Sequence, residues 1–285
     1  MLRVYAQLVG SVVLWGGTWV SGRLLAQSMP SFCAAFLRFV VASAFLVGWA
    51  WWRTGAIPRP PRHWGLVALL GATGIFAYNY FFFTGLATVP AGRAALIIAT
   101  APLVITLASP QGWRPQVIGG ALVALAGAGT VLAHGAPWRL FATGLTTGDL
   151  HILGCVVSWS AYSILNARAT RRMEPITAVT WACVAGTLLL ALPALQSDVV
   201  EHARTATLLD WGNIVFLGVL ATGVAFTWYV QGIQAVGAPR AGVFINLVPV
   251  CAVLLAWMLL GEPIDFSLVA GGLLVLCGVR LANRR

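Results

Sequence analysis

Long apolar runs constrain this chain more than any other feature. A bilayer core about 30 Å thick is crossed by roughly 20 apolar residues in helical form. Clusters of Arg, Pro and Gly separate ten such runs. Their approximate limits are 4–26, 31–52, 63–86, 91–109, 115–133, 148–168, 175–195, 208–233, 239–260 and 265–282. Because the runs lack the alternating polarity of barrel strands, we predict an all-α polytopic membrane protein with ten transmembrane helices and a longer connection at 196–207.

Composition excludes several other classes of protein. Charged residues make up 8% of the chain, against about 25% in soluble domains. The net charge is +10, but the basic residues are all arginines scattered between apolar runs, so we predict no nucleic-acid partner. The five cysteines lie in apolar runs without metal-ligand spacing, and no catalytic dyad is evident. We therefore expect that the protein binds no metal or cofactor and is not an enzyme. We expect a monomer, and its partners should be the lipid bilayer and a small-molecule substrate.

The arginines also predict orientation. With a cytoplasmic N-terminus, twelve arginines face the cytoplasm and only four face the other side. This bias places both termini in the cytoplasm. Residues 4–25 are longer than the apolar core of a signal peptide, so we interpret them as a retained first span.

One phrase occurs twice in the sequence. "TVPAGRAALIIATAPLV" at 88–104 and "AVGAPRAGVFINLVPVC" at 235–251 match at an offset of 147 residues, and "GSVVLW" at 10–15 resembles "GCVVSW" at 154–159. We interpret 1–140 and 141–285 as two copies of a five-helix repeat. Since five is odd, the copies enter the membrane from opposite sides, which is the architecture of alternating access. A duplication that merely builds a bundle is the alternative.

Three stretches resemble a known family. "LWGGTWVSGRLL" in the first run, "FLRFVVASAFLV" in the second and "LLGEPIDFSLVAGGLLVLCGV" at the end are similar to the EamA-type repeats of the drug/metabolite transporter superfamily. The resemblance covers essentially the whole chain, and length and aromatic content are most similar to its bacterial aromatic amino-acid exporters. It implies a ten-helix fold, export across the bacterial inner membrane and a central cavity for amino acids or related metabolites. The first repeat departs from the pattern, since "ASPQGWRPQ" stands where the second has Gly-Glu-Pro.

Candidate binding residues follow from what the runs contain. Asp and Glu occur only at the ends of runs or between them, so facilitated transport is a simpler hypothesis than proton coupling. A cavity would then be lined by aromatic and uncharged polar groups, whose ring faces attract an ammonium group. The same aromatic residues could instead pack or mark the membrane interface. The candidates are Trp15, Trp19, Tyr78, Asn79, Trp159, Tyr162, Ser163, Asn166, Trp228 and Asn246.

Three arginines need separate explanations. Arg38 lies about two turns inside the second run, and its counterpart in the other repeat is the neutral Cys183. We favour an Arg38 that reaches outward or binds helix carbonyls; the alternative is that it faces the cavity and meets a substrate carboxylate. Arg93 and Arg240 open the fourth and ninth runs, and we expect both to be interfacial anchors.

Two prolines occupy equivalent depths in the two repeats. Pro102 and Pro249 lack an N–H and would clash with the carbonyls of Ile98 and Ile245 in a continuous helix. We predict paired bends that act as hinges, with static kinks as the alternative. The Gly-rich stretches in 115–133 and 265–282 allow close helix approach, and we expect these two helices to pack together.

These observations favour an inner-membrane exporter of amino acids, aromatic and other neutral ones, that works by alternating access. The alternative within the same class is an exporter of other small metabolites or drugs. The alternative from a different class is a membrane channel or scaffold.

Overall fold

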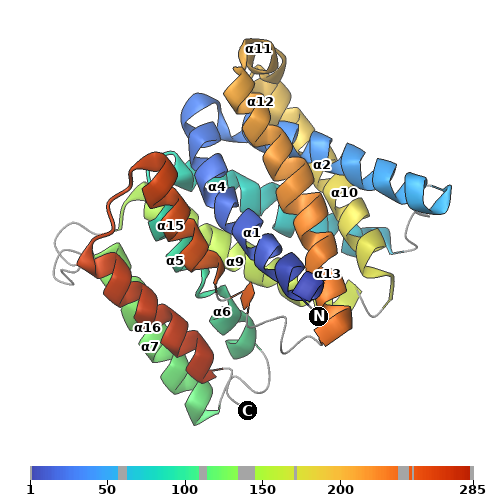
Figure 1. The fold of residues 1–285 in the computed structure, drawn as a ribbon. Helices are drawn as coiled ribbons and strands as arrows, with labels where there is room; N and C mark the ends of the chain where they lie inside the picture. The colour runs from blue at the N-terminus through green and yellow to red at the C-terminus, as the bar shows by residue number, and fades with distance from the viewer. Residues whose placement is uncertain are drawn as a thin grey trace.

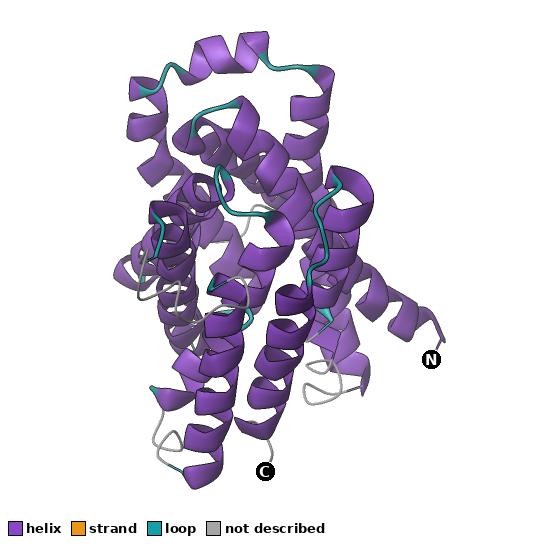
Figure 2. Ribbon diagram, turned by 90° about the vertical axis from the view of Figure 1, so that its left-hand side faces the viewer, coloured by secondary structure: helices purple, strands orange, loops and turns teal. Residues whose placement is uncertain are grey.

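The computed structural model describes residues 2–56, 63–108, 114–133, 145–169, 172–236, 244–245 and 247–282. Within them every regular element is a helix (Figures 1 and 2). The first half forms α1 (Leu2–Ser28), α2 (Ser31–Thr54), α3 (Trp64–Leu70), the π-helix η1 (Gly71–Ala77), α4 (Tyr78–Leu86), α5 (Ala91–Ile98), α6 (Ala101–Leu107) and α7 (Pro115–Leu132). The second half forms α9 (Thr147–Ala169), α10 (Pro175–Gln196), α11 (Val199–Thr205), α12 (Leu208–Val215), the π-helix η3 (Phe216–Val224), α13 (Ala225–Val236), α15 (Val248–Leu260) and α16 (Phe266–Ala282).

Length and hydropathy identify the membrane-crossing helices. Six helical stretches are long and apolar enough to cross a bilayer, and four further apolar helices are shorter. The six are Leu2–Ser28, Ser31–Trp52, Trp64–Leu86, Thr147–Ala169, Ile176–Gln196 and Leu208–Tyr229. The four shorter ones fall on the fourth, fifth, ninth and tenth apolar runs. The all-helical membrane class is therefore confirmed, while the count of ten crossings stays a prediction.

Three sequence expectations about helix boundaries are corrected. The connection expected at 196–207 contains the short helix α11. In the fourth run the helix is interrupted just before Pro102 rather than bent as a continuous helix, because α5 ends at Ile98 and α6 begins at Ala101. Similarly, Pro249 is the second residue of α15. Both prolines therefore lie in a first helical turn, where the missing N–H costs nothing and the clash expected with the carbonyl of Ile98 or Ile245 does not arise.

Helices α7 and α16 pack along their glycines. Figure 1 shows the two side by side at the lower left. A Cβ added at Gly127 would lie 2.6 Å from the carbonyl oxygen of Gly271, and one at Gly278 would overlap the backbone of Ala124. The expected packing of these two Gly-rich helices is confirmed, and it depends on the missing side chains.

The remaining helices contact one another across the two halves in a mirrored way. α1 packs against α13 and α15, while its repeat counterpart α9 packs against α4, α5 and α6. Gly10 of α1 accommodates the ring of Trp228, and Gly154 of α9 accommodates the ring of Phe81. α2 lies against α10, its own counterpart. Exchanging the halves therefore reproduces these contacts, although, among the described helices, α1 also packs against α4 and α5 without a comparable contact of α9 with α13 or α15.

The N-terminal end of α1 and the C-terminal end of α16 lie on the same side of the helical bundle. In Figures 1 and 2 the N-terminal end of α1 and the C-terminal end of α16 lie toward the bottom, away from α11 at the top. This agrees with termini on one side of the membrane. That this side is the cytoplasm stays a prediction.

Candidate functional site

A cavity of about 430 Å³ lies between the two halves. This volume is within the range of sites for small molecules. Twelve helices contribute to its wall: α1, α2, η1, α4, α5, α6, α9, α10, η3, α13, α15 and α16. Nine of the thirteen candidates named from sequence line it: Trp15, Trp19, Arg38, Tyr78, Asn79, Pro102, Trp159, Tyr162 and Pro249.

Three other candidates are described and are not on this wall. Trp228 instead packs on Gly10. The Ser163 hydroxyl donates to the carbonyl of Trp159, 2.7 Å away, and neither it nor Asn166 reaches the cavity. Helical periodicity predicted that Trp159, Tyr162, Ser163 and Asn166 of α9 all face the cavity. The cavity spans only about one turn of that helix, so only the first two line it. Asn246 lies outside the described residues.

Aromatic side chains form two walls of the cavity. On one, the ring centroids of Trp159 lie 5.4 Å from Tyr78 and 5.3 Å from Tyr162. On the other, Trp15 lies 5.4 Å from Phe226 and 5.1 Å from Tyr229 in edge-to-face contacts. The Trp15 indole Nε1 donates to the carbonyl of Ala221 at 3.1 Å, which fixes its orientation. Each wall therefore offers apolar surface with polar tips.

Two π-helices position these walls. η1 directly precedes Tyr78 and Asn79, and η3 ends two residues before Phe226. The hydroxyl of Thr222 donates to the carbonyl of Leu217, five residues earlier, at 2.8 Å. A π-helix is wider than an α-helix and changes which face the following residues present, and such segments often occur at functional sites. Both π-helices end at positions that correspond at the 147-residue offset.

Arg38 is buried and faces the cavity, so the interpretation we favoured from sequence is wrong. Its Nη1 donates to Asn79 Oδ1 at 3.0 Å, and Asn79 Nδ2 donates to the carbonyl of Ile75 at 2.8 Å. The guanidinium carbon lies 5.0 Å from the ring centroid of Phe39. Arg38 therefore neither reaches out of the protein nor donates to a helix carbonyl in the contacts described; it donates to the side-chain amide of Asn79 on a neighbouring helix. Arg38 is the one charged residue among the described residues of the wall.

Arg93 also differs from expectation. Instead of an exposed interfacial anchor, it is buried, and its Nη1 donates to the carbonyl of Val131 at 2.5 Å. Its Nη2 lies 3.6 Å from Asp265 Oδ2. Arg93 therefore connects α5 to the end of α7 and the start of α16, which satisfies its charge away from water. Arg240, the other expected anchor, lies outside the described residues.

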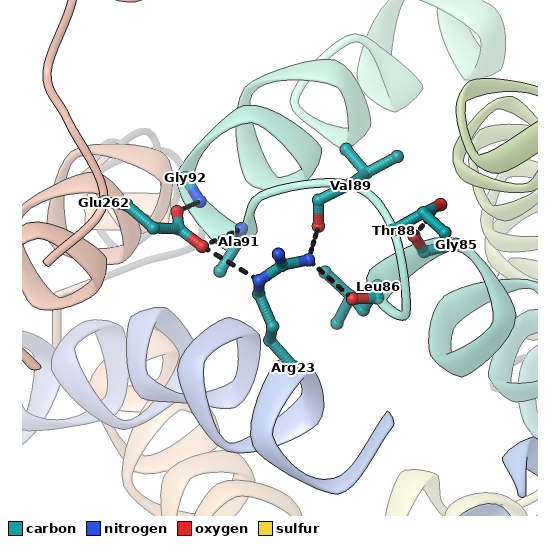
Figure 3. Close-up of polar contacts among 8 residues, drawn as sticks. All are labelled: Arg23, Gly85, Leu86, Thr88, Val89, Ala91, Gly92 and Glu262. Atoms are coloured by element: carbon teal, nitrogen blue, oxygen red, sulfur yellow. Dashed lines mark hydrogen bonds and ion pairs between the residues drawn. The ribbon is translucent and has the colours of Figure 1, made fainter. Parts of the chain in front are cut away.

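The Gly-Glu-Pro element contacts the start of α5 (Figure 3). Gly261 is in the left-handed conformation (φ 65°) and ends α15, which directs Glu262 toward α5. The Glu262 carboxylate accepts the N–H groups of Ala91 at 2.8 Å and Gly92 at 3.1 Å, and its Oε1 lies 3.2 Å from Arg23 Nε. The carboxylate thus satisfies donors at the N-terminus of α5 and complements the helix dipole.

Arg23, on α1, contacts the same region of the chain. Its Nη1 donates to the carbonyls of Leu86 at 2.8 Å and Val89 at 2.6 Å. Arg23 lies one turn along α1 from Trp19, whose ring is 5.2 Å from that of Phe82. We refer to Arg23, Glu262 and the first turn of α5 as the Arg23–Glu262 cluster. It joins the two halves just beyond the cavity.

Some lining residues were missed from sequence, although the repeat contained a signal for one of them. Shifting the candidate Asn79 by 147 residues gives Phe226, which lines the cavity. Tyr229 has no such signal, because its counterpart Phe82 was not a candidate. Thr222 and Phe39 carry no comparable signal.

Comparisons with known proteins agree with this architecture. A model described as the EamA-like transporter family matches residues 2–133 and 146–284. The chain is 29% identical to the aromatic amino acid exporter YddG of Ancylobacter novellus, over 98% of this chain and 95% of that protein. It is 30% identical to a probable terminal-alkyne amino-acid exporter of Streptantibioticus cattleyicolor, over 98% and 92%. A solved crystal structure is similar with a TM-score of 0.64 and 26% identity, covering 99% of this chain and 98% of that one. Other relatives are uncharacterised transporters.

Proposed function

The chain belongs to the EamA-like transporter family, and from this premise we propose that it exports amino acids, aromatic and other neutral ones, across a bacterial inner membrane. The observation that carries the proposal is the central cavity, with two aromatic walls and one buried guanidinium. Two relatives, at 30% and 29% sequence identity, are named as amino-acid exporters. Ring faces attract an ammonium group by about 0.5–2 kcal/mol each, and Arg38 suits a carboxylate.

Transport occurs by alternating access of two inverted five-helix repeats, 1–140 and 141–285. The mirrored neighbours of α1 and α9 support this arrangement. Hinges lie at Pro102 and Pro249, where the structure interrupts the fourth run and begins α15. Both prolines also line the cavity, so a change of angle there would alter the shape of the site.

The Arg23–Glu262 cluster is the gate on the side that α11 faces, the outer side in our orientation. The residues beneath it, Trp19, Phe82 and Leu86, are buried. Substrate must pass this layer to leave the cell, so the contacts between Arg23, Glu262 and α5 break in the outward-open form. Export is facilitative, since the described cavity wall contains no carboxylate or histidine that could carry a proton.

Purified protein in proteoliposomes tests the proposal. Vesicles preloaded with phenylalanine, tryptophan, leucine, lysine or glutamate are diluted, and efflux is followed. We expect saturable efflux of the aromatic and neutral amino acids and little efflux of lysine. Flux that rises linearly with concentration would identify a channel, and saturable flux of none of the five would refute amino-acid export. Concentrative uptake driven by a pH gradient alone would refute the facilitative mechanism.

A further inference from the structure

We infer that the cavity recognises the carboxylate of its substrate and provides no ionic partner for an ammonium group, so that apolar monocarboxylates without an amino group bind as well. This inference rests on the proposed function and specifies its substrate class. Amino acids are then one kind of cargo among aromatic and aliphatic carboxylates.

The first step is the observation that no acidic residue lines the cavity. The chain has seven Asp and Glu residues, and all seven belong to the described part of the structure. None lines the cavity. Glu262 and Asp265 pair with Arg23 and Arg93, and Asp210 caps the start of α12. A substrate ammonium in the cavity therefore finds aromatic faces and carbonyl groups but no carboxylate.

The second step is the state of Arg38. Its side chain is buried, and within the described residues no carboxylate forms an ion pair with it. Its Nη1 donates to Asn79, and its buried Nε has no hydrogen-bond partner in the part of the chain that the structure describes. A buried cation without a counter-ion is costly, so an anionic ligand is favoured there. A carboxylate can accept two hydrogen bonds from one guanidinium.

The third step is the asymmetry of the site. The repeat counterpart of Arg38 is Cys183, which also lines the cavity but carries no guanidinium. The wall formed by Trp15, Phe226 and Tyr229 is aromatic. A ligand with one carboxylate and one apolar end therefore has a preferred direction in the cavity. A cationic amine without a carboxylate would place its charge in a cavity that already holds Arg38.

Three analogues of one size test the inference in direct binding measurements on the purified, nanodisc-embedded protein. They are L-phenylalanine, 3-phenylpropionate, which lacks the amino group, and 2-phenylethylamine, which lacks the carboxylate. We expect 3-phenylpropionate to bind within about fivefold of phenylalanine, because the loss of the cation–π attraction is offset by the removed cost of taking the ammonium group out of water. We expect 2-phenylethylamine to bind about 10- to 150-fold more weakly, the effect of losing hydrogen bonds to a charged group.

The outcomes separate this inference from the proposed function. If phenylalanine binds and 3-phenylpropionate does not, the inference is overturned while amino-acid export stands. If 3-phenylpropionate binds and phenylalanine does not, carboxylate recognition stands and amino-acid export fails. Binding of 2-phenylethylamine alone, or of none of the three, overturns both.

Two variants assign the effect to the guanidinium. Arg38→Gln should abolish the preference for 3-phenylpropionate over 2-phenylethylamine, and Arg38→Lys, which keeps the charge, should restore part of it. Cys183→Ala changes the counterpart position in the same cavity and should leave the order of the three analogues unchanged. Thermal unfolding of each variant shows whether it is folded. A folded Arg38→Gln variant with the wild-type order of analogues would overturn the assignment.

Discussion

Replacing Glu262 with glutamine should open the outer end of the cavity. The amide keeps the size of the carboxylate but loses its charge and turns one acceptor into a donor. The variant therefore loses the pairing with Arg23 and one of the two N–H contacts at Ala91 and Gly92. The contacts join the two halves of the chain, so their loss should favour the form in which the halves separate at this end.

The size of the effect follows from the contacts and their exposure. Hydrogen bonds to a charged group contribute about 1.5–3 kcal/mol, whereas exposed ion pairs contribute about 0–1 kcal/mol. The side chains of Arg23 and Glu262 are 18% and 14% exposed, so water offsets part of the loss. We estimate a net change of about 1–3 kcal/mol, which shifts the equilibrium between closed and open forms about 5- to 150-fold.

Cysteine accessibility measures this shift. The five native cysteines are replaced first, and a single cysteine is introduced at Ala95, which is buried and lines the cavity one turn inside Ala91. A membrane-impermeant maleimide is then added from the side that α11 faces. The labelling rate should rise by at least about fivefold in the Glu262→Gln variant, in proportion to the open population.

A matched control distinguishes the gate from a general loss of charge. Glu201→Gln removes the same charge from α11, where the residue is exposed, and should leave the labelling rate unchanged. An unchanged rate in a folded Glu262→Gln variant would refute the gate and leave the Arg23–Glu262 cluster as a static cap on α5.

Three further predictions follow from other parts of the structure. Trp15→Leu should raise the half-saturating phenylalanine concentration in flux assays about 2- to 30-fold, because one ring face is lost. Trp228→Leu, away from the cavity, should leave this concentration unchanged. Equal effects of the two substitutions would contradict the assignment of the walls. Pro102→Ala supplies a backbone N–H where α6 begins and should lower the rate of transport with binding unchanged; normal transport would exclude a hinge. Gly278→Ala should cost about 1–3 kcal/mol because the added Cβ meets the backbone of α7, while Gly119→Ala, which faces open space, should not destabilise; thermal unfolding compares the two.

Most of the helical framework could be predicted from the sequence because long apolar runs are a local signal. The similar stretches "GSVVLW" and "GCVVSW" also paired positions correctly at a distance: Gly10 and Gly154 occupy equivalent contacts in the two halves. Where a helix starts was less well predicted. Pro102 was expected within a continuous helix, yet α5 ends at Ile98 and α6 begins at Ala101, just before the proline. Nothing in apolar periodicity distinguishes a bend from a break.

The binding site was predictable only where composition restricts the choice. Arg38 stood out as a charge within an apolar run, but its partner Asn79 lies 41 residues away and comes from another helix. The π-helices η1 and η3 were missed because the search assumed 3.6 residues per turn. The same assumption placed Ser163 on the cavity face, whereas its hydroxyl bonds to its own helix.

Counterflow measures the central claim most directly. Proteoliposomes loaded with unlabelled phenylalanine are diluted into a trace of labelled phenylalanine, and the label inside is followed over time. A carrier with one central site alternately open to each side should accumulate the label transiently above the outside concentration, and Arg38→Gln should weaken this accumulation. Label that only equilibrates, at a rate independent of the unlabelled phenylalanine inside, would contradict the account.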